Sequence, residues 1–198
     1  MPAKSQIHED RYDQVVKWLE HDIWQLDQMV QTLSDYYQLT PSDIEQLNRF
    51  AKRTLLSMLP ALLESIFIRI ARLTEASVKN GHENLTLGSL VHQLRLRNEL
   101  EKADEVERRF LELQKTTRSI REDHRHQRYA HLNFDVGTNA KKLPVVPLTG
   151  IQEATKEIEN LMTYASNSSL HWKADSQGNL KSLALSLKNY YELRMAKK

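Results

Sequence analysis

Apolar residues recur at three- and four-residue steps along most of this chain, and few helix-breaking residues interrupt them. Leu19, Ile23, Leu26, Val30 and Leu33 form one such series, and comparable series follow in later segments. This spacing is typical of helices with one buried face. Only five glycines and five prolines occur among the 198 residues, which favours helix over sheet. We therefore predict an all-α helical bundle.

Changes in the pattern mark the first two expected helices. A long amphipathic helix covers residues 7–38, and its aromatic residues are interpreted as core and interface packing: Trp18, Trp24, Tyr36 and Tyr37. The second helix starts with a capping hydroxyl, a proline and an acid: Thr40, Pro41 and Asp43. Pro60 is expected to kink or split it, and Asn80–Gly81 to end it. Residues 61–71 are apolar on nearly every side, so we predict that they are the most buried stretch.

The rest of the chain divides into further helices and two loops. The expected helices are a short one capped by Thr86, a long one over residues 99–132, one opened by a capping box at Thr149–Gln152, and a last one from Leu180 to Tyr191. The expected loops are residues 133–148 and 166–179. We predict a bundle over residues 1–135 with a long N-terminal helix. Residues 136–198 are expected to form a C-terminal helical extension that packs on the same domain.

The composition limits the possible functions and locations. No cysteine occurs, so the chain has neither a disulfide framework nor a thiolate metal site. The formal charge of +2 is too small to indicate nucleic-acid binding from the whole chain. The first residues contain no apolar core of a secretory signal, and no run reaches the length of a membrane span. We expect a cytoplasmic protein with no membrane partner.

A basic, titratable cluster lies near the middle of the chain, in the sequence REDHRHQRYAHLN. It contains three of the eight histidines and stands where the apolar stripe of the preceding helix has ended. An imidazole exchanges protons near neutral pH, and a guanidinium holds a phosphate through two hydrogen bonds. Both capacities serve phosphodiester cleavage without a metal. The candidate residues are Arg121, His124, Arg125, His126, Arg128 and His131.

Helical geometry separates two of these residues. At about 100° per residue, one face of an α-helix carries four of them: Arg121, His124, Arg128 and His131. Arg125 lies beside Arg121 but about a third of a turn from His131. Arg125 and His131 therefore act together only if the helix unwinds near His131 or a second copy of the chain contributes to the site. The second case predicts a symmetric homodimer with the cluster at its interface.

The heptapeptide from Arg125 to His131 resembles the signature of the HEPN superfamily, in which an arginine is followed by a polar residue and then by a histidine. Arg125, His126 and His131 fill these places, and Tyr129–Ala130 suits the abortive-infection (AbiU-type) form. The resemblance implies a helical, dimeric, metal-independent endoribonuclease that needs no cofactor. It also implies a role in phage defence or in a toxin–antitoxin system, with RNA and an antitoxin protein as partners.

The resemblance, which covers roughly residues 40–135, also suggests a role for each site residue. His131 would be the general base, Arg125 would stabilise the charge on phosphorus, and His126 would orient both. Three further residues are predicted to contact the RNA backbone: Arg121, His124 and Arg128. Family members that are silenced by nucleotide transfer carry a tyrosine where this chain has Asn133, so we do not expect that form of control.

Other interpretations of the cluster stay open. A basic helix end is often a solvated face that opposes the helix dipole. A metal site would require the helix to bring three histidines together: His124, His126 and His131. The chain could also be a helical module that binds RNA or a protein without cutting. A DNA-binding regulator is less favoured, because no basic recognition helix is found.

Overall fold

The computed structural model describes residues 4–79, 81–130 and 145–167. The elements are α1 (Lys4–Tyr37), α2 (Pro41–Thr74), β1 (Val78–Lys79), β2 (His82–Glu83), α3 (Leu87–Leu96), α4 (Leu100–Thr116), η1 (Ser119–Ala130) and α6 (Leu148–Ser166). The all-α prediction is confirmed, since one short hairpin is the only sheet in the described part of the chain. No helix in these ranges is long and apolar enough to cross a membrane.

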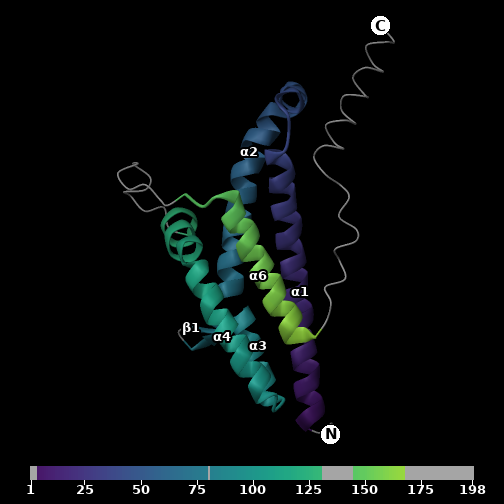
Figure 1. The fold of residues 1–198 in the computed structure, drawn as a ribbon, viewed down its shortest axis with the longest axis vertical. Coiled ribbons are helices and arrows are strands. Elements are labelled where there is room, and N and C mark those ends of the chain that lie inside the picture. Colours follow the sequence, from purple (N-terminus) through teal and green to yellow (C-terminus); the bar gives the residue numbers. More distant parts are fainter. Residues whose placement is uncertain (1–3, 80, 131–144, 168–198) are drawn as a thin grey trace, which may run out of the picture.

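The long helices α1 and α2 run antiparallel, and α6 packs against both α1 and α4 (Figure 1). One hydrophobic core takes buried side chains from α1, α2, α3, α4, η1 and α6. Residues 148–166 therefore form a wall of the bundle. Their helix begins directly after Pro147, so the predicted capping box at Thr149–Gln152 is wrong. Residues 168–198, with the predicted last helix, lie outside the described residues.

Tyr12 on α1 forms a hydrogen bond with the end of α6. Its hydroxyl donates to the carbonyl of Ala165 at 2.7 Å, and the guanidinium of Arg97 lies 4.4 Å from the centre of its ring. Burial raises the pKa of Tyr12 to about 12, with Arg97 opposing the shift. The hydroxyl therefore keeps its proton, and the hydrogen bond its donor, throughout the neutral range.

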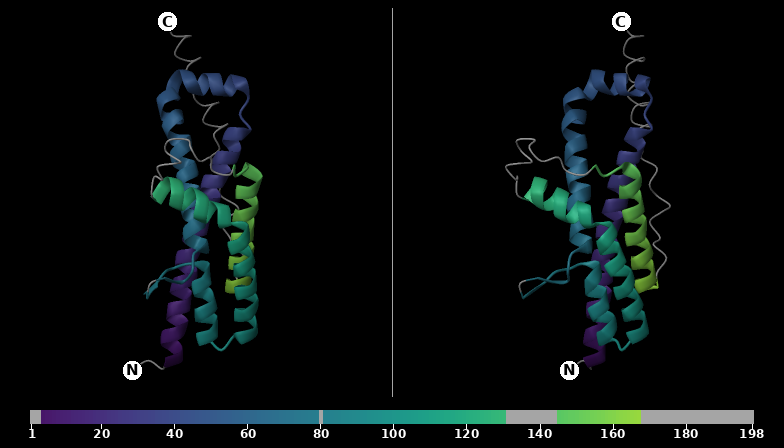
Figure 2. Two further views of the ribbon diagram at one scale, coloured as in Figure 1. Left: turned by 90° about the vertical axis from the view of Figure 1, so that its left-hand side faces the viewer. Right: turned by 60° about the vertical axis from the view of Figure 1, so that its left-hand side comes forward.

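The start of α2 follows the sequence prediction. The Asp43 N–H donates to Thr40 Oγ1 at 3.2 Å, and the Thr40 N–H donates to Asp43 Oδ2 at 2.9 Å. Figure 2 shows α2 turning sharply at one end of the molecule before it runs alongside α1. Pro60 stands inside α2 and does not split it, since the helix continues from Pro41 to Thr74.

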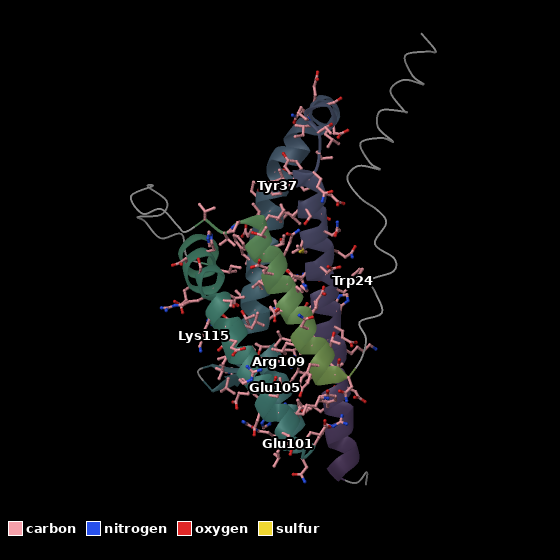
Figure 3. All side chains as sticks on the ribbon, in the orientation of Figure 1. Trp24, Tyr37, Glu101, Glu105, Arg109 and Lys115 are labelled. Carbon is pink, nitrogen blue, oxygen red and sulfur yellow. The ribbon has the colours of Figure 1, made fainter. Side chains whose placement is uncertain are left out.

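The prediction that residues 61–71 are the most buried stretch is wrong, because a larger share of α3 (Leu87–Leu96) is buried. Ile66 and Ile70 are fully buried, but Ile68 is 39% exposed. The helices packed on α2 cover only part of its circumference, so its apolar residues exceed the face it can bury. Of the aromatic residues of α1 that were interpreted as core and interface packing, Trp18 is 63% exposed and Tyr37 64%, and Figure 3 shows Trp24 on the outer side of α1. Tyr36 packs against a small second core cluster.

The prediction that Asn80–Gly81 ends α2 is wrong, because α2 stops at Thr74 and Gly81 lies between the two strands of a hairpin. Asn80 lies outside the described residues. The two strands are antiparallel, with Val78 opposite Glu83 and Lys79 opposite His82. Gly81 has a φ of +78°, which glycine adopts without strain. An Asn-Gly pair is a strong hairpin signal, and the sequence prediction used it only as a helix stop.

The described part of the predicted helix over residues 99–132, which ends at residue 130, is two helices. α4 ends at Thr116, and η1 runs in a different direction from it (Figure 2). The hydroxyls of Thr116 and Thr117 both donate to the carbonyl of Leu113, at 3.0 and 2.7 Å. The Thr117 backbone N–H donates to the same carbonyl. Threonine side chains that bond back to the helix in this way compete with backbone hydrogen bonds and bend helices.

Asp22 joins α1 to α2 through two arginines. Its carboxylate lies 2.8 Å from Arg69 and also pairs with Arg72. The side chains of Arg69 and Asp22 are only 16% and 18% exposed. Partial burial lowers the pKa of Arg69, and the charge of Asp22 opposes that effect. The pair is therefore partly removed from water, so that loss of one charge leaves the other poorly solvated.

We expect Asp22→Asn to lower the free energy of unfolding by about 1–3 kcal/mol, between the values for exposed and buried ion pairs. Urea denaturation measures this loss. Glu112→Gln is the matched control, because it breaks an exposed pair with Arg108 (57% and 61% exposed) and should cost less than about 1 kcal/mol. Equal losses in the two variants would show that Asp22 does not hold the helices together.

Candidate functional site

Five of the six residues of the Arg/His cluster lie on η1, which is π-helical from Ser119 to Ala130, and His131 lies outside the described residues. A π-helix bonds residues five apart, so each turn takes more than the 3.6 residues of an α-helix. Residues four or five apart then share a face. Arg125 and His126 follow Arg121 by one such turn, whereas His124 does not. The predicted grouping of Arg121 with His124 on one face is therefore wrong.

His124 is a packing residue in this structure. It is 7% exposed, and its ring centre lies 4.8 Å from that of Phe67 on α2, with 44° between the planes. Thr117 and Ile120 precede it in the chain and are also buried, so they continue the buried stripe of α4 toward α2. A buried ring is not available to an RNA backbone. We therefore correct the prediction that His124 contacts RNA: it fixes η1 on the bundle.

Arg121 is anchored at the junction of α2, α4 and η1. Its Nη2 donates to the carbonyl of Gln114 at 2.9 Å, and the Gln114 amide donates to the carbonyl of Thr74 at 2.8 Å. Thr117 Oγ1 lies 3.4 Å from Thr74 Oγ1. Within the described residues, the buried Nε of Arg121 and the buried hydroxyl of Ser119 have no hydrogen-bond partner. The Arg121 guanidinium therefore has one N–H donor, at Nε, that no described residue uses.

The remaining candidates lie at the far end of the segment. Arg125, His126 and Arg128 belong to η1, and His131 and Asn133 lie outside the described residues. No group of three or more histidine, aspartate or glutamate side chains in the described ranges is arranged to hold a metal. His131 lies outside these ranges, so a site of His124, His126 and His131 remains an alternative.

Sequence reasoning named the candidate residues of the cluster but missed the residues that hold Arg121 and His124 in place. Nothing in the sequence marks Phe67, Thr74 or Gln114 as a support of the site. Each residue fits the helical pattern of its own segment, so no other role is indicated. The pair Thr116–Thr117 was the available clue, since consecutive threonines inside a helix favour a bend. The bend gives η1 its own direction and its own contact with α2.

Comparison of the sequence with protein-family models and curated proteins, and of the fold with solved structures, gives no match.

Proposed function

We propose that this protein is a metal-independent endoribonuclease of the HEPN type that acts in phage defence or in a toxin–antitoxin system. The observation that supports this most is the coincidence of the Arg/His motif with a π-helical segment. Such helices are rare, and π-helical turns frequently occur at functional sites. Packing of His124 on Phe67 and the bond from Arg121 to Gln114 hold the segment on the bundle.

The proposed reaction uses the ribose 2′-hydroxyl as nucleophile. The 2′-oxygen attacks the adjacent phosphorus, and the bond from phosphorus to the 5′-oxygen breaks as the new bond forms. His131 takes the hydroxyl proton as general base, and Arg125 stabilises the extra negative charge on phosphorus. A second His131 in a homodimer, a protonated His126 or water gives a proton to the leaving 5′-oxygen. The products carry a 2′,3′-cyclic phosphate and a 5′-hydroxyl.

The other basic residues have supporting roles in this proposal. Arg121 positions the segment and offers its spare Nε donor, and Arg128 contacts the RNA backbone. His126 orients Arg125 and His131. A homodimer brings two motifs over one substrate. Arg125 of one copy can then act with His131 of the other, although the two residues are separated around a single helix. A cytoplasmic location and an antitoxin partner complete the proposal.

We expect the purified full-length protein to cleave single-stranded RNA in the presence of EDTA and to leave 2′,3′-cyclic phosphate ends. Mass spectrometry of the fragments identifies these ends. The same RNA with 2′-O-methyl groups is the control, because it lacks the nucleophile but keeps the phosphate charges. It should bind and remain uncut.

Two outcomes would contradict the proposal. If EDTA abolishes cleavage and an added divalent metal restores it, the reaction depends on a metal. If the protein binds RNA but cuts none of the sequences in a random library, the alternative of a non-catalytic RNA-binding module is favoured.

A further inference from the structure

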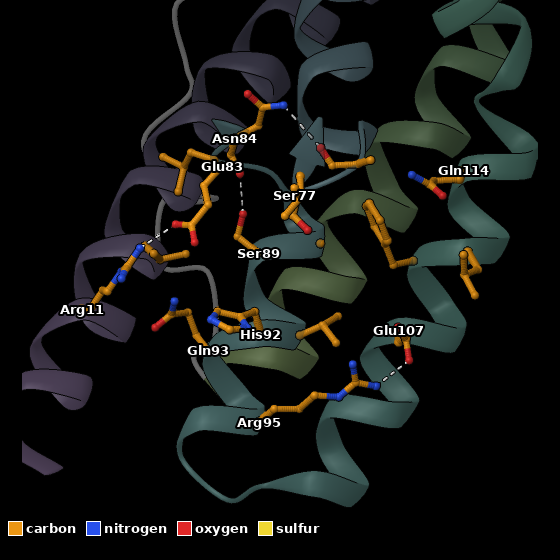
Figure 4. A pocket seen from close by; sticks show the side chains of 18 residues that line it. Arg11, Ser77, Glu83, Asn84, Ser89, His92, Gln93, Arg95, Glu107 and Gln114 are labelled. Carbon is orange, nitrogen blue, oxygen red and sulfur yellow. Dashed lines mark hydrogen bonds and ion pairs between the residues drawn. The ribbon is translucent and has the colours of Figure 1, made fainter. Parts of the chain in front are cut away.

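A pocket of about 670 Å³ lies where the β1–β2 hairpin folds back beside α3 (Figure 4). Its walls come from the start of α1, the hairpin, α3 and α4. This volume is within the range of about 300–1,000 Å³ that is usual for small-molecule sites. Gly88 shapes one wall, because a Cβ there would lie only 2.9 Å from Cε1 of Phe110. The missing side chain lets the phenyl ring of Phe110 lie directly against α3.

Apolar side chains gather at this pocket while remaining in contact with water. Val78 is 61% exposed, Leu85 40% and Leu111 51%, and all three line the pocket together with the buried Val91 and Phe110. Three apolar side chains left exposed around one concavity indicate a surface that a ligand covers. Covering them gains roughly 25 cal/mol for each Å² removed from water.

The charges of the lining cancel. Arg11 pairs with Glu83 at 2.7 Å on one side of the pocket, and Arg95 pairs with Glu107 at 2.7 Å on another (Figure 4). Each guanidinium is therefore already opposed by a carboxylate. An anionic ligand would have to displace a glutamate, and a cationic ligand would have to displace an arginine. The balance favours an uncharged ligand.

A buried amide supplies the polar contact. Gln93 lines the pocket and is only 3% exposed, and its enclosed Oε1 has no hydrogen-bond partner among the described residues, so a ligand reaches this amide only after the side chain turns toward the pocket. A buried acceptor without a partner costs about 1–3 kcal/mol. A half-turn of the last side-chain torsion exchanges the oxygen and nitrogen of the amide, so Gln93 has both acceptor and donor capacity for a ligand. Glutamine amides pair in this way with the edges of nucleobases.

We propose that this pocket binds an unpaired nucleobase of the RNA substrate. A nucleobase is flat, uncharged and bordered by N–H donors and acceptors, which suits apolar walls, balanced charges and a buried amide. Unpaired bases turned out of a strand are the usual targets of sequence-specific RNA recognition. This inference rests on the proposed function, because it makes the pocket the site that selects which RNA is cut.

One residue connects the pocket to the motif. The side chain of Gln114 lines the pocket, and its backbone carbonyl accepts the hydrogen bond from Arg121 at 2.9 Å. Arg121 stands seven residues further along the chain, and Arg125 follows one π-helical turn later. In this proposal the RNA strand whose base occupies the pocket continues toward Arg121.

The test compares wild-type protein with Gln93→Leu, which removes the amide and keeps a similar volume, and with Leu111→Ser, which alters an exposed residue at the pocket rim. Gln38→Leu is the matched control, because Gln38 is exposed and lies beyond the end of α1. Calorimetry measures the binding of free nucleosides and of 2′-O-methyl oligonucleotides. Sequencing of cut ends gives the base preference around the cleaved bond, and circular dichroism checks each fold.

We expect oligonucleotides with the preferred base to bind Gln93→Leu at least about tenfold more weakly, which corresponds to one lost hydrogen bond. Leu111→Ser should also weaken the binding of these oligonucleotides, and Gln38→Leu should bind them as wild type does. Both pocket variants should cut RNA with a reduced base preference. An unchanged base preference in both would overturn the pocket proposal and leave the proposed function standing. Binding of free nucleosides alone, without a base effect in oligonucleotides, would also overturn it. If wild type cuts no RNA, the proposed function fails, and with it the selecting role of the pocket.

Discussion

Replacing His131 with alanine is expected to lower the rate of RNA cleavage by a factor of about a hundred to ten thousand, the usual contribution of a general base. Arg125→Ala is expected to lower it by about a hundred- to a thousandfold, because a donor to the developing charge is lost. Single-turnover assays measure both rates. The described part of the apolar stripe ends at Ile120 and His124, so we expect both variants to fold as wild type does.

Arg118→Ala is the matched control for these variants. Arg118 stands just before η1, its side chain is 73% exposed, and it pairs with Glu122 outside the proposed site. Its loss should leave the cleavage rate within about twofold of wild type, as expected for a weak surface pair. Equal rates for wild type, Arg125→Ala and His131→Ala would show that the motif is not the active site.

Mixing the two inactive variants tests whether the site is shared between subunits. A heterodimer of Arg125→Ala and His131→Ala retains one site with both native residues if the arginine and histidine come from different copies. Part of the activity should then return. If no activity returns although the subunits exchange, the two residues act within one chain.

The largest expected effect on stability is at Ile70. Ile70→Ala should lower the free energy of unfolding by about 2–5 kcal/mol, because Ile70 is fully buried in the main core and its truncation leaves a cavity. Ile68→Ala is the control of the same residue type on the same helix. It is 39% exposed and should cost less than about 1 kcal/mol. Urea denaturation with an unchanged slope compares the two.

A loss at Ile68 as large as that at Ile70 would contradict the position of Ile68 on an open face. It would show that a second copy or another segment of the chain covers this side of α2 in solution.

The sequence was informative where structure depends on local chemistry. Thr40 and Asp43 fix the start of α2 through hydrogen bonds between near neighbours. The sequence was less informative where neighbouring helices decide. Ile68 and Ile70 have the same side chain and stand on one helix, yet only the contacts of α2 with other helices determine which of them is buried.

The same distinction applies to the candidate site. The residue types of the cluster indicate its chemistry, and they were found directly. The π-helix was not predicted from the sequence. An α-helix bonds residues four apart and a π-helix residues five apart, and the residue pattern does not distinguish the two. Contacts from outside the segment favour the wider turn: Gln114 holds Arg121, and Phe67 holds His124. Neither contact can be read from the order of residues within 119–130.

Gln114 has a thermodynamic consequence for substrate recognition. Its amide lies at the pocket, where it bonds to Thr74, and its carbonyl holds Arg121 at the start of the motif segment. If a ligand in the pocket restricts the motion of Gln114, the affinity of η1 for phosphate rises. By linkage, phosphate bound at η1 raises the affinity of the pocket for its ligand by the same factor. Sequence preference and backbone affinity would then be two measurements of one coupling free energy.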